Sequence, residues 1–574
     1  MLKLLKNIKV YKWLMLTVFV LMFAQAMSEL YLPTLMGDIV DHGVVTGDVG
    51  YIWKIGGVML LVAAIGVTVS VLASYYSAKI AMGLGRDIRR NVFTHVQDFS
   101  LKEFDEVGTA SLITRTTNDI TQIQQVLMML LRMVIMAPFM MIGGIIMAVS
   151  KDAKLSLVIV ATMPVLAGAV ILIMKKGVPL FKAVQERLDK LNRVMRENLT
   201  GVRVIRAFHR EEQEADRLQD ANANLTNVSI RVNKLMAFMM PTMMLLMNMT
   251  IVAIIWFGGI RIDHGGMQIG DLMAFIQYVM QIMFALVMAS MMFVIVPRAS
   301  VSANRINAVL EQKPSIYDHG KHSADKLPGT LEFDHVSFRY PGAEEPALSD
   351  ISFTARPGEV TAIIGGTGSG KSTLVHLIPR FYDATSGTIR VNGTDIQAAT
   401  QAEIRSKIGF VPQQATLFTG TIADNIRFGK EDATTEEIMH AATIAQADEF
   451  IQDMENGYET NVEQGGTNVS GGQKQRLSIA RALVRKPDIY LFDDSFSALD
   501  YRTDANLRAA LKTETNQATV LIVAQRVSTV LDADRIIVLD HGHVAGIGIH
   551  KELVKSNDVY REIVASQLGE EEIA

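Results

Sequence analysis

Cysteine is absent from the 574-residue sequence, which excludes disulfides, thiolate metal sites and cysteine nucleophiles. An excess of cations is also absent. The net charge is −4, and this excludes nucleic acid as a main partner because no cations are left over to neutralise phosphates. Methionine, in contrast, is abundant, and of the 33 methionines only Met439 and Met454 follow residue 320. The two halves of the chain therefore differ chemically, as expected of a membrane part fused to a soluble part.

Six apolar stretches in the first half are long enough to cross a bilayer core, which takes about 20 helical residues. These stretches lie near 13–36, 55–78, 126–149, 155–174, 235–258 and 271–296. Cations crowd the connections 79–125 and 175–234 and are scarce in the others. Since positively charged loops stay in the cytoplasm, we predict a multi-pass protein of the plasma (inner) membrane with both termini cytoplasmic.

The two cation-rich connections contain few glycines and almost no prolines. Unstructured loops of that length are unusual, so we expect the membrane helices to continue far into the cytoplasm. Such stalks would carry force between a soluble motor and the membrane.

Methionines gather in the third, fifth and sixth apolar stretches. Flexible thioethers repack around ligands of different shape, so they suit a cavity for varied hydrophobic substrates; contact with lipid in place of leucine is the alternative. Glu29 lies within the first stretch, where an ionisable group is costly. Either it binds a cationic substrate, or it pairs with Arg132 or a polar neighbour for structural reasons. Weaker candidates of the same kind are Gln25, Asn248, Gln277 and Gln281.

The predicted domains are a transmembrane domain (1–311), a polar linker (312–329) and a soluble nucleotide-binding domain (330–574). In the soluble half an apolar run, Val360–Ile364, leads into the sequence GGTGSGKS, Gly365–Ser372. This run is a P-loop in its required setting, with a strand before it and a helix after.

Glycines in a P-loop let successive N–H groups point at phosphate oxygens, and the helix N-terminus adds a positive partial charge. Lys371 is expected to contact the β- and γ-phosphates of ATP, and Ser372 to ligate Mg²⁺. The other candidate ATP-binding residues of this segment are Gly365, Thr367, Gly368, Ser369, Gly370 and Thr373.

The sequence NVSGGQKQR, Asn468–Arg476, closely resembles the signature motif of ATP-binding cassette (ABC) proteins. The resemblance extends over essentially all of 330–565. It implies a head-to-tail dimer with two ATPs at the interface, in which the signature grips the γ-phosphate held by the partner. The residues implied for that role are Ser470, Gly471, Gly472 and Gln473.

Further ABC motifs occur in the family's order. By resemblance, Tyr340 stacks on adenine, Gln413 senses Mg²⁺ and the transmembrane domain, Asp493 coordinates Mg²⁺, and Asp500 belongs to the loop that communicates between the two sites.

The cytoplasmic connections also resemble those of ABC exporters, at Phe99–Ile120 and Glu197–Glu214. In that family each connection bends at a short coupling helix that contacts a nucleotide-binding domain. The resemblance places the two turns near Phe104–Gly108 and Phe208–Glu212.

Two positions depart from the family pattern. Asp494 stands where hydrolysing members have a glutamate that polarises the attacking water, and Gln525 stands where they have a histidine. The shorter carboxylate is withdrawn by about 1 Å, and a misplacement of that size can cost roughly 100-fold in rate. Glutamine can still form hydrogen bonds but cannot become cationic. We therefore predict slow hydrolysis at this chain's own catalytic residues, although Asp494 working as an adequate base is the alternative.

These observations predict an α-helical six-helix transmembrane domain with long cytoplasmic extensions, fused to an α/β P-loop ABC domain. The chain resembles a type IV ABC exporter half-transporter, in particular the degenerate-site subunit of bacterial heterodimeric multidrug exporters. The resemblance implies ATP and Mg²⁺ as cofactors, and a second half-transporter, the lipid bilayer and a small hydrophobic, drug-like and in some cases cationic substrate as partners. The alternatives are a homodimeric multidrug exporter or lipid flippase with two working sites, and a non-transporting ATP sensor.

Overall fold

The computed structural model describes residues 6–318, 327 and 329–568, and the chain divides into two compact units. Unit 1 comprises Met1–Gln97 and Thr109–Gln312, and unit 2 comprises Asp98–Gly108 and Lys313–Ala574. The segment Asp98–Gly108 lies within the predicted transmembrane domain in sequence but groups with unit 2 in space. Part of the predicted linker (319–326 and 328) lies outside the described residues.

In the part of unit 1 that the structure describes, six helices are long and apolar enough to cross a membrane, as predicted. They are α2 (Lys12–Ile39), α3 (Val49–Gln97), α6 (Ile120–Lys151), α7 (Leu157–Thr200), α9 (Glu211–Asp263) and α10 (Ile269–Glu311). Shorter elements of unit 1 are η1 (Lys6–Tyr11), η2 (Val40–Val44), α5 (Thr109–Thr114), η3 (Arg115–Asp119) and α8 (Val202–Ala207). With 53 residues, α9 spans about 80 Å, far more than a bilayer core requires, so it extends beyond the membrane as expected.

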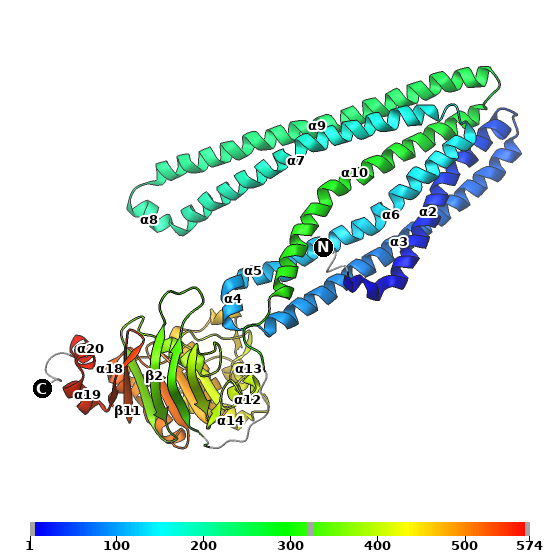
Figure 1. Cartoon of the computed structure of the whole chain (residues 1–574). Coiled ribbons are helices and arrows are strands. Elements are labelled where there is room, and N and C mark those ends of the chain that lie inside the picture. Colours follow the sequence, from blue (N-terminus) through cyan, green and yellow to red (C-terminus); the bar gives the residue numbers. More distant parts are fainter. Residues whose placement is uncertain (1–5, 319–326, 328, 569–574) are drawn as a thin grey trace. The chain divides into compact units, whose positions relative to one another are not determined.

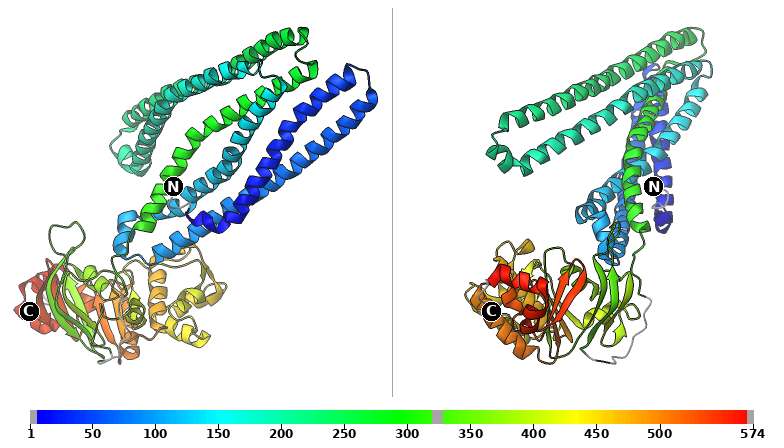
Figure 2. Two further views of the ribbon diagram at one scale, coloured as in Figure 1. Left: turned by 45° about the vertical axis from the view of Figure 1, so that its right-hand side comes forward. Right: turned by 60° about the vertical axis from the view of Figure 1, so that its left-hand side comes forward.

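Within unit 1, α7 and α9 run side by side and are joined by α8 at the end remote from the other four long helices (Figures 1 and 2). The apolar core of the unit lies mainly between α2, α6 and α10, with further side chains from α7 and α9; Phe275 and Tyr278 of α10 are fully buried in it. The hydroxyls of Thr34 and Tyr278 lie 2.5 Å apart and join α2 to α10.

Within its described residues, unit 2 contains three β-sheets. Their strand orders are β2-β1-β4-β5, β12-β11-β3-β10-β9-β6 and β7-β8. The strands are β1 (Leu331–Phe338), β2 (Leu348–Ala355), β3 (Val360–Gly365), β4 (Ser386–Val391), β5 (Thr394–Asp395), β6 (Ile408–Val411), β7 (Gly420–Thr421), β8 (Asn461–Val462), β9 (Ile489–Asp493), β10 (Thr519–Val523), β11 (Arg535–Asp540) and β12 (His543–Gly548).

Helices surround these sheets and include α4, which the chain contributes from between α3 and α5. The helices of unit 2 are α4 (Leu101–Val107), α11 (Lys371–Leu377), α12 (Gln401–Ser406), α13 (Ile422–Arg427), α14 (Thr435–Ile444), α15 (Asp448–Gln452), η4 (Gly457–Glu459), η5 (Gln464–Gly466), α16 (Gly471–Leu483), α17 (Tyr501–Glu514), α18 (Val527–Val530), α19 (His550–Ser556) and α20 (Asp558–Leu568).

Strands β3, β6, β9, β10 and β11 of the six-stranded sheet are mostly buried, which is why they read as largely continuous apolar runs, whereas β12 at the edge is partly exposed. Along β3, Ala362 and Ile364 join one core cluster while Ile363 joins the other. Strands β3, β6, β9, β10 and β11 are parallel, so their carboxyl ends meet at one edge of the sheet. That edge is the expected place for a ligand site in an open α/β sheet.

Candidate functional site

Residues from four parallel strands converge at this carboxyl edge. β3 ends at Gly365 and β9 at Asp493, while Gln413 and Gln525 stand two residues after the ends of β6 and β10. The α/β topology therefore brings together residues spread along the chain from Gly365 to Gln525.

The P-loop connects β3 to α11 through glycines with left-handed backbone. Gly368 has φ +84° and Gly370 has φ +97°, and a Cβ at Gly370 would lie 2.8 Å from the Ala347 carbonyl oxygen. Only glycine tolerates both demands without strain. The loop can therefore curl as phosphate binding requires.

Lys371 begins α11, and its amine folds back over the loop. Its Nζ donates to the carbonyl oxygens of Gly365 (2.8 Å) and Gly366 (2.7 Å). Burial lowers the pKa of Lys371, and the carboxylates of Asp494 and Asp493 oppose that shift. A buried ammonium held by neutral carbonyls and two acidic neighbours is well placed to bind an anionic phosphate.

Ser372 and Asp493 form a pair of hard oxygen ligands. The Ser372 hydroxyl donates to Asp493 Oδ1 at 3.0 Å, and Asp493 is only 2% exposed. Burial raises the pKa of Asp493, opposed by the hydrogen bond from Ser372. Nearby in the loop, the buried Ser369 hydroxyl has no hydrogen-bond partner among the described residues. An orphaned donor, a buried ammonium and a hydroxyl–carboxylate pair together fit the triphosphate and Mg²⁺ of MgATP.

Asp494 follows β9 in a left-handed conformation, with φ +48°. Its Oδ2 accepts hydrogen bonds from two amides, Gln525 Nε2 at 2.9 Å and Gln413 Nε2 at 3.4 Å. Burial raises the pKa of the Asp494 carboxyl, and the hydrogen bond from Gln413 opposes the shift. One oxygen of the carboxylate is thus held between two side-chain amides. The structure brings together both positions that depart from the family pattern.

The signature residues lie at the start of α16. Ser470 caps this helix: its hydroxyl accepts from the Gln473 backbone N–H (3.3 Å), and Gln473 Oε1 accepts from the Ser470 N–H (2.8 Å). Ser470 and Gly471 are exposed, and across the described residues no hydrogen bond joins the signature to the P-loop. Asp500 caps α17 in the same way, accepting from the Thr503 N–H at 3.0 Å. The signature is therefore free to contact a ligand carried by another chain.

Tyr340 follows β1 and faces the P-loop helix. Its hydroxyl lies 3.1 Å from the Thr373 hydroxyl, and its ring meets that of Tyr382 edge-to-face with centroids 5.5 Å apart. Sequence reasoning identified Tyr340 but missed Tyr382, which has no motif of its own. It also missed His376, whose Nε2 lies 3.8 Å from Asp493 Oδ2. His376 lies on α11 and Tyr382 follows that helix. The contacts of both residues become visible only in the folded chain.

Unit 1 contains a cavity of about 720 Å³ between α2, α6, α9 and α10. Of the sixteen described residues that line it, nine are methionines, and the others include Gln25, Glu29, Arg132 and Gln281. Glu29 accepts a hydrogen bond from Gln25 Nε2 at 2.9 Å, and Gln281 Nε2 donates to the Glu29 carbonyl at 3.3 Å. Among the described residues no ion pair joins Glu29 to Arg132. Of the weaker polar candidates, Asn248 and Gln277 are not among the lining residues.

Two protein-family models match the chain, one for each unit. The ABC transporter transmembrane region matches residues 15–286, and the ABC transporter model matches residues 348–497. An uncharacterized ABC transporter ATP-binding protein of Mycobacterium tuberculosis (strain CDC 1551 / Oshkosh) is 44% identical over 98% of this chain and 97% of its own length. The chain therefore belongs to the ABC transporter family, as a half-transporter with exporter architecture. It is a multi-pass membrane protein whose ATP-binding cassette makes it an ATPase.

Two further similarities bear on function. An ATP-dependent lipid A-core flippase of Chromobacterium violaceum is 30% identical over 96% of this chain and 94% of its own length. A solved structure of a bacterial Atm1-family ABC exporter with ATP bound has a TM-score of 0.79 at 25% identity, covering 98% of each chain. The predicted fold class, a six-helix membrane domain followed by an ABC domain, is confirmed.

Proposed function

We propose that this chain is the degenerate-site subunit of a heterodimeric ABC exporter in the plasma membrane, with both termini cytoplasmic. Its own P-loop binds MgATP but hydrolyses it slowly, while its intact signature completes a working site on a different half-transporter. One observation carries the proposal: the carboxylate of Asp494 is tied to the amides of Gln525 and Gln413.

In the binding role, Lys371 and the backbone of Gly365–Gly370 hold the phosphates, and Tyr340 and Thr373 border the adenine side. Ser372, Asp493 and Gln413 are the candidate Mg²⁺ ligands. When bound, Mg²⁺ would offset charge on the phosphate oxygens. Every residue needed to hold the nucleotide is present, so the proposal predicts ordinary ATP binding.

In the hydrolytic role, the two departures reinforce each other. A general base must reach the proton of the attacking water, and Asp494 is one methylene shorter than glutamate. Its Oδ2 already accepts from Gln525, 2.9 Å away. Gln525 presents an amide donor to that carboxylate and has no basic nitrogen, so it cannot act as a charged histidine would. Loss of general-base assistance is worth about 10²–10⁴-fold in rate.

The α7–α8–α9 hairpin supports a second chain as partner. Its cytoplasmic end exposes apolar side chains: Leu199 is 73% exposed, Val204 is 61% and Phe208 is 74%. The short helix α8 lies at Val202–Ala207, just before the turn predicted at Phe208–Glu212. Exposed apolar side chains clustered outside the membrane mark a protein-contact surface. We assign this end to the partner's nucleotide-binding domain.

The methionine-lined cavity is the proposed substrate site. The proposed substrates are hydrophobic compounds, including cationic ones. Thioethers supply an adaptable apolar wall. Glu29 supplies a carboxylate that Arg132 does not neutralise by an ion pair within the part of the chain that the structure describes.

Photolabelling of the native complex tests the proposal. Affinity-tagged chain would be isolated with its partner from native membranes and labelled during turnover with 8-azido-ATP carrying either an α- or a γ-phosphate label. This chain should retain the γ-label while the partner loses it, and Asp494→Glu with Gln525→His should make this chain lose it as well. Equal loss of γ-label from the two wild-type chains would refute the degenerate site.

A homodimeric exporter or lipid flippase is the second candidate, favoured by the 30% identity to a lipid A-core flippase. It requires two working sites in identical chains. Tagged chain that recovers only itself from native membranes, and that hydrolyses ATP briskly, would support this candidate.

A further inference from the structure

Helix α4 is separated from the rest of unit 2 by about 200 residues of sequence, yet it is fixed there by a buried carboxylate. Glu103 is 3% exposed and accepts from the Ser100 N–H (2.8 Å), the Ser100 hydroxyl (2.7 Å) and the Ser315 N–H (3.2 Å). The hydroxyls of Ser100 and Ser315 lie 3.0 Å apart. The start of α4 is therefore held to the chain that follows α10.

The second half of α4 is held by one tyrosine. The Tyr382 hydroxyl donates to Asp105 Oδ2 at 3.0 Å. Tyr382 is 9% exposed, and its ring packs against Phe338 and Tyr340, each with centroids 5.5 Å apart. Burial and the hydrogen bond to Asp105 raise the pKa of Tyr382, so the hydroxyl keeps its proton and remains the donor.

Tyr340 stands between this tyrosine and the P-loop helix. Its ring meets Tyr382 at an interplanar angle of 82°, and its hydroxyl lies 3.1 Å from that of Thr373, the residue after Ser372. A purine that stacks on Tyr340 would fix the plane of that ring, and the edge of the ring is in contact with Tyr382. Two side chains, Tyr340 and Tyr382, thus separate the proposed adenine position from α4.

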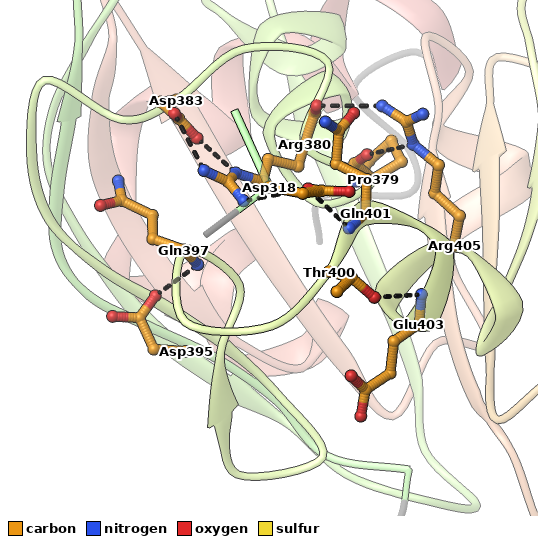
Figure 3. Close-up of polar contacts among 10 residues, drawn as sticks. All are labelled: Asp318, Pro379, Arg380, Asp383, Asp395, Gln397, Thr400, Gln401, Glu403 and Arg405. Atoms are coloured by element: carbon orange, nitrogen blue, oxygen red, sulfur yellow. Dashed lines mark hydrogen bonds and ion pairs between the residues drawn. The ribbon is translucent and has the colours of Figure 1, made fainter. Parts of the chain in front are cut away.

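Tyr382 lies in the turn Pro379–Asp383, which is held by side-chain hydrogen bonds from Arg380 and Arg405; Figure 3 draws these bonds. Arg380, 5% exposed and with φ +54°, donates from Nε and Nη2 to Asp383 (2.8 and 3.3 Å). Arg405 donates to the carbonyls of Pro379 (3.0 Å) and Arg380 (3.3 Å).

The chain that follows α10 reaches this turn as well. Asp318 Oδ1 lies 3.9 Å from Arg380 Nη1 and accepts from the Gln401 N–H at 3.0 Å, as Figure 3 shows. The turn after the P-loop helix is therefore where α4 and the unit 2 segment that contains Asp318 are both attached.

We propose that Tyr382 is a positioning residue that couples adenine on Tyr340 to the position of α4 through its hydrogen bond to Asp105. The inference rests on the proposed function in taking Tyr340 as the adenine contact. We call the chain of contacts Tyr340–Tyr382–Asp105 the relay. Because coupling between two sites is reciprocal, removing the hydrogen bond at its α4 end must weaken ATP binding in turn. The triphosphate contacts the P-loop rather than Tyr340, so a ligand without adenine should not sense the relay.

A double-mutant cycle with two ligands tests this in the full chain in nanodiscs. Affinities for ATP and for inorganic tripolyphosphate would be measured for wild type, Asp105→Ala, Tyr382→Phe and the double variant. Each single variant should weaken ATP binding about three- to tenfold, the scale of one ordinary hydrogen bond, and leave tripolyphosphate binding unchanged. The double variant should lose no more than either single one. Tyr458→Phe is the matched control, since its hydroxyl donates to Asp448 at 2.5 Å away from α4.

A spin label gives a readout of α4 itself. The chain has no native cysteine, so Lys102→Cys on α4 provides a single attachment point. ATP should change the label's mobility in the otherwise wild-type chain and in Tyr458→Phe, but not in Tyr382→Phe at saturating ATP.

Three results would overturn the relay. One is unchanged ATP affinity in Asp105→Ala and Tyr382→Phe while Tyr340→Ala weakens it. Another is equal weakening of ATP and tripolyphosphate, which indicates general damage to the P-loop. The third is an unchanged label response in Tyr382→Phe. If wild type instead binds ATP no better than tripolyphosphate, the assignment of adenine to Tyr340 fails first, and the relay fails with it.

Discussion

Two regions of the candidate nucleotide site differ in how closely their residues follow the ABC family pattern. The phosphate-binding region, Gly365–Thr373, has Gly368 and Gly370 in left-handed conformations, its lysine buried and Ser372 against Asp493. The γ-phosphate region has Asp494 held by two glutamine amides. Binding and hydrolysis make separate demands on a protein, and a chain can keep the first while losing the second.

The largest effect is expected from a substitution in the phosphate-binding region. Lys371→Ala removes the buried ammonium from the P-loop, and ATP affinity should fall about 100-fold because charge-assisted hydrogen bonds to phosphate are lost. Equilibrium binding of a fluorescent ATP analogue measures this. Lys430→Ala is the control, since that lysine pairs with Glu437 (2.7 Å) and should leave affinity unchanged. An affinity loss below threefold in Lys371→Ala would mean that the P-loop does not hold the phosphates.

The second prediction tests whether ATP hydrolysis, unlike ATP binding, depends on a second chain. Phe208→Asp places a charge on the 74% exposed apolar end of the α7–α8–α9 hairpin. ATPase activity of the native complex should fall about tenfold, since a desolvated charge is costly at an interface, while ATP binding by this chain persists. Phe208→Leu should retain most of the activity. Full activity in Phe208→Asp would remove this residue from the interface.

A smaller effect is expected in the membrane cavity. Glu29→Gln should reduce affinity for a cationic hydrophobic compound by about three- to tenfold, and spare its neutral analogue of the same shape. Fluorescence quenching in ATP-free nanodiscs reads binding without hydrolysis. Equal loss for both compounds would indicate that Glu29 has a structural role only.

The smallest effect concerns the attachment of α4. Burial opposes ionisation of Glu103, but hydrogen bonds from Ser100 and Ser315 outweigh it and lower the pKa of this carboxyl. A depressed pKa stabilises the fold above the unfolded value of about 4.3, and this stabilisation is lost as pH falls through the folded pKa. Glu103→Gln should therefore cost about 1 kcal/mol at pH 7 and progressively less below pH 4. Thermal unfolding across that range checks this, with exposed Glu431→Gln as the control. A cost that does not vary with pH would contradict the account.

Sequence reasoning predicted the fold well because two signals were strong, the long apolar stretches and the ABC motifs. Apolar stretches of membrane length gave six helices, and glycine-rich and apolar motifs gave the ABC domain. Candidate site residues could be named from the sequence where a motif carries the chemistry, as at Lys371 and Asp493, and their roles stay predictions.

What sequence reasoning missed depends on contacts across the fold. Nothing at Asp105 or Tyr382 signals that their side chains meet, since they are 277 residues apart. The grouping of Asp98–Gly108 with unit 2 was missed for the same reason. The shared hydrogen-bond acceptor of Gln413 and Gln525 also appears only once β6, β9 and β10 are placed side by side.

The central claim is tested most directly by measuring ATP binding and ATP turnover on one preparation of the wild-type chain in nanodiscs, beside Asp494→Glu with Gln525→His. The account predicts that the wild type saturates with ATP as the double variant does, with turnover near background. Turnover by the wild type alone at about 1 s⁻¹ or faster, within the usual range of enzymes, would contradict it.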